Sequence, residues 1–288
     1  MRGLSPDDAS KASRMLDVEV PTLVLLEIMD DFKNDTDCRD FGRHRSSILK
    51  ANNFRILDDP SWLLYKNGSL KEVSPEKEEE KSISEDFVKL ILDYNWNEIE
   101  NRPINIYNFS GMERLLKVFE HLKDILESDK RDHLCRIRSM WNDNPLNFNN
   151  NPKKELNNEI YFSILKSYMK LLNIKRINYN NIESDFAFYV GCMAYNIIKY
   201  GKKYGEKPKN LIPLKCLEYM DGNDFMDSMI IQYISLRNNK ILVTCDKNII
   251  DIFSVVSNIL ATSNSKRLRI LSKKTFCLSL QDFKKLIS

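Results

Sequence analysis

A helix pattern followed at once by a short strand pattern, within residues 221–251, most strongly constrains the fold of this chain. Apolar residues recur at helical spacing over Met226–Ile234, and Asp224 and Asp227 share one face of this helix because they stand three residues apart. Ile241–Val243 then forms a continuous apolar run. Such a run is typical of a strand buried on both faces of a parallel sheet.

Polar residues follow this strand directly. Thr244 and Asp246 stand where it ends, and ligands of open α/β sheets bind outside the carboxyl ends of the strands. Asp246 is therefore a candidate functional residue. Asp224 and Asp227 have a second interpretation, since acids in a first helical turn stabilise the helix dipole whether or not a ligand is present. Both interpretations stay open for these two acids.

Composition and charge narrow the class of protein. The 288 residues include 42% hydrophobic and 30% charged residues, which is typical of a globular chain with a large core. The formal charge of +3 is too small to indicate a nucleic-acid-binding protein by itself. The six cysteines lack the paired spacing of zinc sites, which favours free thiols and a cytoplasmic location. The sequence also lacks an apolar run near the roughly 18 residues that a membrane helix needs.

The N-terminal region adds a second pattern of strand, turn and helix. The segment VEVPTLVLLEI, residues 18–28, places Glu27 on the helix that follows a short strand. Together with residues 221–251, this order resembles the PIN-domain family of metal-dependent ribonucleases. The tail extends the resemblance, with Arg267–Leu271 as a last strand and Ser279–Ile287 as a closing helix. The resemblance covers the two ends of the chain and leaves out its middle.

The resemblance implies an α/β fold of three layers, α/β/α, with a mostly parallel central sheet and a large helical insertion. Residues 1–75 and 215–288 are then the PIN-like domain, and residues 76–214 are the insertion, with a charged linker around residues 66–81. The family's first strand carries an Asp, but Met1 falls where that strand should already have ended. We therefore expect that the chain begins downstream of its true start or that this member has lost the strand.

The middle of the chain is expected to be mainly helical. Aromatic and leucine stripes at helical spacing, such as Phe87–Tyr94, Leu115–Leu126 and Tyr161–Leu171, indicate core-facing helices. Residues 185–200 are apolar around the whole circumference of the expected helix, which indicates burial.

The resemblance gathers four acids from distant segments at one edge of the sheet: Glu27, Asp224, Asp227 and Asp246. Clustered carboxylates repel one another unless a cation lies between them, and an all-oxygen site favours Mg²⁺ or Mn²⁺. Thr244 is expected to hydrogen-bond a neighbouring carboxylate or a metal-bound water. These residues form the expected catalytic and metal site, with hydrolysis of a phosphodiester as the reaction.

Two basic segments are candidate contacts for single-stranded RNA. Lysines and a tyrosine interleave at Lys202, Lys203, Tyr204 and Lys207, and such a mixture can hold a strand by charge and base stacking. Arg43 and Arg45 offer guanidinium groups that suit phosphate. An ordinary basic loop and a solvated basic face remain the alternatives for these segments.

Two functions therefore compete. The first is a divalent-metal-dependent endoribonuclease with a toxin, defence or RNA-processing role. The second is a catalytically inactive PIN-like module that binds RNA or a protein partner through its helical insertion, and the missing first acid favours this second function. An antitoxin as partner and a homo-oligomer are both compatible with the sequence.

Overall fold

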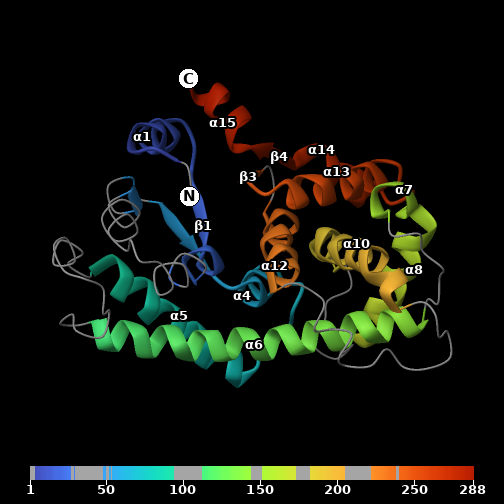
Figure 1. Ribbon diagram of the computed structural model, residues 1–288, viewed down its shortest axis with the longest axis horizontal. Helices are drawn as coiled ribbons and strands as arrows, with labels where there is room; N and C mark the ends of the chain where they lie inside the picture. The colour runs from blue at the N-terminus through green and yellow to red at the C-terminus, as the bar shows by residue number, and fades with distance from the viewer. Residues whose placement is uncertain are drawn as a thin grey trace. The chain divides into compact units, whose positions relative to one another are not determined.

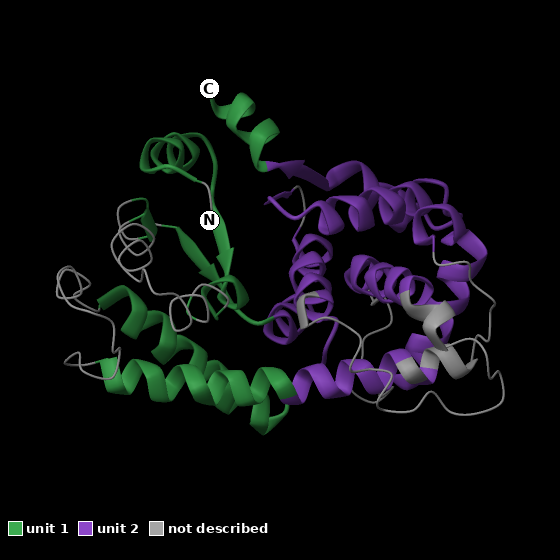
Figure 2. Cartoon of the chain, in the orientation of Figure 1, with its two compact units in different colours: residues 1–59, 73–127, 280–288 green, residues 60–72, 128–279 purple. Residues whose placement is uncertain are grey.

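The computed structural model describes residues 4–26, 29, 48–49, 52, 54–93, 112–143, 151–172, 182–204, 222–237 and 240–288 (Figure 1). The chain forms two compact units (Figure 2). Unit 1 comprises residues 1–59, 73–127 and 280–288, and unit 2 comprises residues 60–72 and 128–279. The expected division at residues 75 and 214 stays a prediction, because residue 214 lies outside the described residues.

The expected three-layer α/β/α fold is wrong. Of the residues that the structure describes, 77% are helical, and the described strands form two separate two-stranded parallel sheets rather than one central sheet. The strands span three or four residues each, so they pair only briefly. Most apolar residues instead recur at helical spacing, and their burial stabilises helix-on-helix packing.

Unit 1 combines helices with the first small sheet. Strand β1 (Glu19–Pro21) pairs in parallel with β2 (Arg55–Leu57), and Thr22 Oγ1 donates a hydrogen bond of 2.9 Å to the carbonyl of Leu57. The helices are α1 (Pro6–Met15), α5 (Pro75–Asp93), the first part of α6 (Met112–Asp143) and α15 (Leu280–Ile287). Helix α5 occupies the second part of the expected charged linker, from Pro75 onward, so that part of the segment is helical.

Helix α1 shows how directly sequence dictates structure here. Ser5 Oγ accepts a hydrogen bond of 3.1 Å from the backbone N–H of Asp8, whose carboxylate in turn accepts one from the backbone of Ser5. This reciprocal capping box fixes the helix start at Pro6. Lys284 of α15 forms an ion pair of 3.1 Å with Asp8, which links the first and last helices of unit 1.

Unit 2 is built around α10 (Ala187–Tyr204), which packs against α12 (Gly222–Leu236), α8 (Asn158–Leu171) and α13 (Lys247–Ala261). Its other elements are α4 (Pro60–Lys66), α7 (Pro152–Glu155), α9 (Ile182–Asp185), β3 (Ile241–Thr244), α14 (Lys266–Lys274), β4 (Phe276–Ser279) and the rest of α6. The burial of α10 residues 187–198 confirms the prediction of an enclosed apolar helix.

The C-terminal strand lies later in the chain than expected. Residues 267–271 belong to helix α14, and β4 pairs in parallel with β3 instead. The strand β3 is not buried on both faces either, because Ile241 is 39% exposed and its partner Phe276 is 53% exposed. The closing helix α15 confirms the expectation for the last residues.

Among the described helices, none has the length and apolar character needed to cross a membrane.

Candidate functional site

Two acids of α12 lie inside unit 2, facing α10. Asp224 is 2% exposed and Asp227 is 6% exposed, although both are ionisable groups. Lys199 of α10 extends its ammonium to 2.9 Å from Asp224 Oδ1, and this lysine side chain remains partly in solvent. Burying a carboxylate is costly unless a charge or hydrogen bonds compensate, so Lys199 offsets part of the cost for Asp224.

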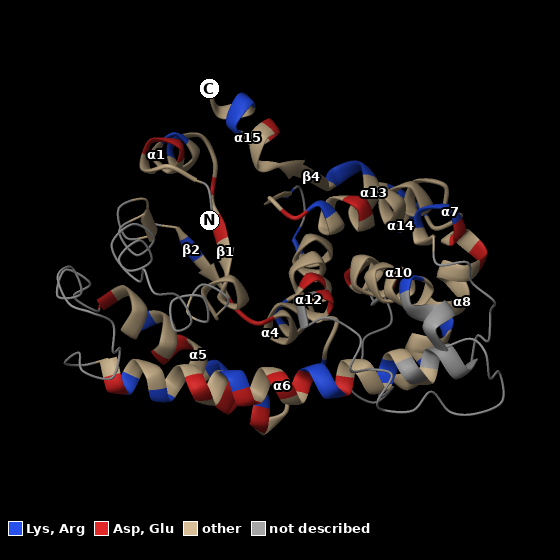
Figure 3. Ribbon diagram, viewed as in Figure 1, with Lys and Arg blue, Asp and Glu red and all other residues tan. Residues whose placement is uncertain are grey.

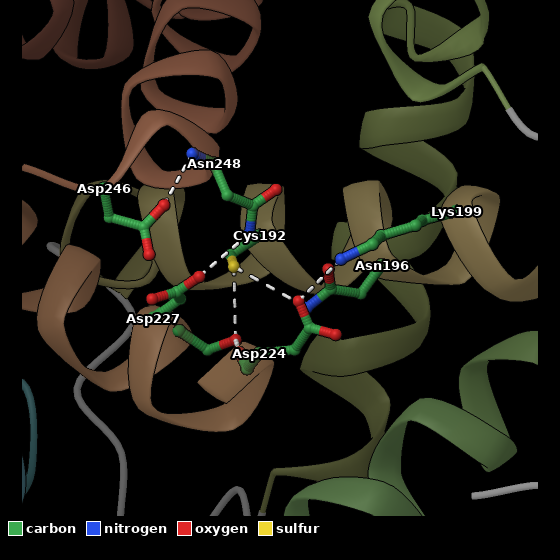
Figure 4. Close-up of polar contacts among 8 residues, drawn as sticks. Cys192, Asn196, Lys199, Asp224, Asp227, Asp246 and Asn248 are labelled. Carbon is green, nitrogen blue, oxygen red and sulfur yellow. Dashed lines mark hydrogen bonds and ion pairs between the residues drawn. The ribbon is translucent and has the colours of Figure 1, made fainter. Parts of the chain in front are cut away.

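One residue links the second of these acids to the end of strand β3. The side-chain amide of Asn248 donates a hydrogen bond of 2.9 Å to Asp227 Oδ2, and its backbone N–H donates one of 2.6 Å to Asp246 Oδ1 (Figure 4). Asn248 therefore holds carboxylates from α12 and from the β3–α13 connection on either side of itself. Because Asp246 is the N-cap of α13, its position follows from ordinary helix capping.

The thiol of Cys192 lies between the helices at the centre of this cluster (Figure 4). Burial raises the pKa of Cys192 strongly, and the nearby carboxylates of Asp227 and Asp224 raise it further. Ser228 Oγ lies 3.2 Å from its sulfur and 2.8 Å from the carbonyl oxygen of Asp224. A thiol in this environment stays protonated, so it is a packing group and not a nucleophile.

Asn196, one helical turn from Cys192, has an incompletely satisfied side chain. It is 1% exposed, and its Nδ2 lies 3.8 Å from Cys192 Sγ. Its Oδ1 is buried and accepts no hydrogen bond from any described residue. Buried polar atoms usually have a partner, so an acceptor that no described residue satisfies is an unusual feature beside the acidic cluster.

The predicted site residues fall into two groups. Asp227 and Asp246 come together in unit 2 through their shared partner Asn248, and Asp224 lies one helical turn from Asp227 and near Cys192. Thr244 lies nearby, where its Oγ1 accepts a hydrogen bond of 2.9 Å from the backbone N–H of Asp246 rather than contacting a carboxylate.

The structure does not place the side chains of the remaining predicted residues. Four of them are not among the residues that the structure describes: Glu27, Arg43, Arg45 and Lys207. For three others, the structure describes the backbone as part of α10 but not the side chain: Lys202, Lys203 and Tyr204. Their predicted roles stay predictions.

The donor atoms of this cluster are of the kind that a hard cation binds, but too few of them converge on one point. Carboxylate oxygens and an amide oxygen are ligands that Mg²⁺ and Mn²⁺ accept. Within the described segments, however, no group of three or more His, Cys, Asp or Glu side chains is arranged to hold a metal ion. Lys199 instead contacts Asp224 Oδ1, and Asn248 contacts Asp227 Oδ2.

Three further residues of the cluster carry a sequence signal of their own. Cys192, Asn196 and Lys199 stand at positions i, i+4 and i+7 of an otherwise apolar helix, so they share one face. A polar stripe on a helix expected to be buried indicates a partner with matching polar groups. That partner is the acidic face of α12.

Comparison of the sequence with models of known protein families gives no match, and the comparisons with curated proteins and with solved structures also give none.

Proposed function

We propose that this chain is a divalent-metal-dependent endoribonuclease whose site carboxylates are Asp224, Asp227 and Asp246. The observation that carries the proposal is the bridging of Asp227 and Asp246 by the single residue Asn248. Two acids separated along the sequence are thereby held next to one another, and a third, Asp224, lies one turn away on α12. The choice of RNA as substrate rests on the resemblance of the terminal segments to the PIN-domain family.

The chemistry follows from the donor atoms. Mg²⁺ or Mn²⁺ held by the carboxylate oxygens of the three aspartates would activate a water molecule and stabilise charge on a phosphodiester. Asn248 orients Asp227 by its amide hydrogen bond, and Lys199 supplies positive charge beside Asp224. A cytoplasmic location is part of this proposal, supported by the four free cysteines among the described residues.

The main test is cleavage of single-stranded RNA with Mn²⁺ by wild type and by Asp227→Asn. Asparagine keeps an oxygen that can accept the Asn248 hydrogen bond, so the substitution removes charge with little change in shape. Mutation of groups that merely support a metal ligand costs about 10–100-fold, so removal of a ligand charge should lower the cleavage rate by at least about 100-fold. The matched control is Asp251→Asn, which breaks only the ion pair of 2.6 Å with Lys153. Equal rates for Asp227→Asn and Asp251→Asn would refute the site.

A second function, a non-catalytic module that binds RNA or a protein partner, is favoured by a specific observation. The Lys199 ammonium contacts one oxygen of Asp224 and the Asn248 amide contacts one oxygen of Asp227, so both buried carboxylates have a polar partner from the protein itself. In that case the cluster stabilises the contact between α10 and α12 and performs no chemistry.

The variant Lys199→Met separates the two functions. Loss of the ammonium leaves Asp224 buried without its countercharge and should lower the free energy of unfolding by about 1–3 kcal/mol, a range reduced because the lysine is partly in solvent. If the cluster binds metal, Mn²⁺ should restore the melting temperature of Lys199→Met, because the ion replaces the lost charge. If Mn²⁺ leaves the melting temperature of the variant unchanged, the cluster is structural and the module is the correct function.

A further inference from the structure

Helix α14 concentrates positive charge on a short segment. Its nine residues include five basic ones: Lys266, Arg267, Arg269, Lys273 and Lys274. The sequence contains no Asp or Glu over residues 252–281, so no acid neutralises this helix from within the surrounding segment. Figure 3 shows Lys and Arg along α14 in blue. A charge excess of this local kind is independent of the small net charge of the whole chain.

The two buried leucines of α14 and four of its basic residues lie on opposite faces of the helix. Leu268 and Leu271 are buried, and α14 packs against α13. With about 3.6 residues per turn, Lys266, Arg267, Lys273 and Lys274 lie on the opposite face around Ile270. These four basic residues are exposed, and Ile270 at the centre is 41% exposed. The outward face of α14 is therefore a basic surface with one apolar residue in its middle.

Several other lysines of the chain have a carboxylate partner. Lys81, Lys117, Lys153 and Lys285 each pair with a carboxylate. By contrast, Lys266, Lys273 and Lys274 have no carboxylate partner among the residues that the structure describes. Surface lysines without local countercharges attract an external anion more strongly than paired ones.

The two arginines have structural contacts as well. Arg269 Nη1 donates a hydrogen bond of 2.6 Å to the carbonyl oxygen of Ser263, which ties α14 to the turn before it. Arg267 lies near enough to the buried Asp185 to lower the pKa of that carboxyl, an effect that burial outweighs. The lysines alone are therefore suitable for substitution without disturbing the packing of α14.

We propose that the outward face of α14 binds the phosphate backbone of single-stranded RNA. Lysine ammonium groups neutralise phosphates and release counterions, and this contact needs no particular base sequence. Ile270 offers an apolar spot against which an unstacked base or ribose can lie. The choice of RNA over DNA rests on the proposed function, whereas the contact with a phosphate backbone rests on α14 itself.

An anionic membrane is a poorer partner for this helix. Interfacial helices bury a broad apolar face in the lipid, with basic residues along its border. The apolar residues Leu268 and Leu271 of α14 are already used against the protein interior, so that Ile270 alone is left for insertion. The arrangement fits an extended polyanion that needs charge and little apolar area.

The test compares two triple variants of the whole chain. The first carries Lys266→Gln, Lys273→Gln and Lys274→Gln. The matched control carries Lys154→Gln, Lys166→Gln and Lys170→Gln, three exposed lysines of α7 and α8 in the same unit. Each triple changes the formal charge by the same amount, from +3 to 0 (+3 − 3 = 0). Binding of a fluorescent 20-nucleotide oligouridylate is measured by anisotropy in EDTA, so that cleavage does not interfere.

The expected result follows from counterion release. A single-stranded site loses about 0.7 in the slope of log K against log salt for each phosphate contact removed, so three contacts reduce the slope by about 2 and the affinity by roughly 100-fold at 0.1 M salt. The control triple should keep the wild-type slope. The free energy of unfolding in urea should differ between each triple and wild type by no more than the roughly 0.5 kcal/mol typical of surface substitutions.

Three outcomes would overturn the proposal: wild-type affinity in the α14 triple, equal losses in both triples, or a loss of binding to phosphatidylserine vesicles with RNA binding intact. The proposed function fails separately. If wild type binds the oligonucleotide through α14 but does not cut it with Mn²⁺, the ribonuclease is refuted and the binding surface stands. If wild type cuts RNA while the α14 triple binds the oligonucleotide with wild-type affinity, the binding surface is refuted and the ribonuclease stands.

Discussion

The acid sensitivity of folding is expected to depend on His133, a histidine of α6 that is 1% exposed. Its Nδ1 lies 2.8 Å from the hydroxyl of Tyr189, and its ring packs edge-on against Tyr189 and Phe225. Its Nε2 has no hydrogen-bond partner among the described residues. Burial lowers the pKa of His133 from 6.5 to about 3, and the positive charge of Arg136 contributes to the shift.

The sign of the effect follows from the direction of this shift. Between pH 6.5 and about 3 the unfolded chain binds a proton at His133 and the folded chain does not. Stability from this residue is therefore complete above pH 6.5 and is lost as the pH falls through that window. With these two pKa values, the loss between pH 7.5 and 5 is about 2 kcal/mol, and the limit below pH 3 is about 5 kcal/mol.

The measurement is urea unfolding followed by helical circular dichroism at several pH values between 5 and 7.5. His133→Asn keeps a polar atom in reach of the Tyr189 hydroxyl and removes the ionisable ring. The variant should be less stable than wild type at pH 7.5, but it should lose about 2 kcal/mol less free energy of unfolding than wild type between pH 7.5 and 5. His121→Asn, at an exposed position of the same helix, is the control and should keep the wild-type pH dependence. If His133→Asn and wild type lose the same free energy between pH 7.5 and 5, His133 is not a buried neutral group.

Two further predictions test the packing and the capping of unit 2. A Cβ atom on Gly191 of α10 would overlap both methyl groups of Val256, so Gly191→Ala should lower the free energy of unfolding by about 1–3 kcal/mol despite the better helix propensity of alanine. In a Val256→Ala background the same change should cost less, as a double-mutant cycle of urea midpoints would show. Asp246→Ala removes the N-cap of α13 and should cost about 0.5–2 kcal/mol, whereas Asp246→Asn, which is also a good cap, should unfold at the wild-type midpoint.

The local elements of unit 2 were predictable where sequence signals agree with one another. Helix α12 and strand β3 lie where helical apolar spacing and a continuous apolar run predict them. These signals act within a few residues of each other, so they need no knowledge of distant contacts.

The arrangement of the strands was not predictable in the same way. An apolar strand such as Ile241–Thr244 indicates that it needs neighbours but does not say how many. In the structure it pairs with Phe276–Ser279, and the sheet ends there within the described residues. Because the chain resembles a family with one central sheet, we expected all of its strands to lie side by side in that sheet. In the structure the parallel pairs β1–β2 and β3–β4 are separate sheets.

The partners of the acids also lay beyond sequence reasoning. Asp224 and Asp227 were singled out because of their spacing, but the residues that compensate their burial, Lys199 and Asn248, come from α10 and α13. Helix packing decides which side chains meet across such an interface. The polar stripe on α10 can be seen in the sequence. That it faces α12 depends on how the two helices pack, which only the structure shows.

The segment Arg267–Leu271 shows how one change of period alters a functional interpretation. As a strand, it would place Arg267, Arg269 and Leu271 on one face, so charge and apolar surface would mix. As part of α14, it places Leu268 and Leu271 together against the interior and leaves the basic residues on the outside. The helical period is favoured because Lys, Arg and Leu are good helix formers and because burial of both leucines on one side stabilises that conformation. The residues that were expected to form the last strand thus form a cationic surface, and the proposed RNA contact follows from the helix.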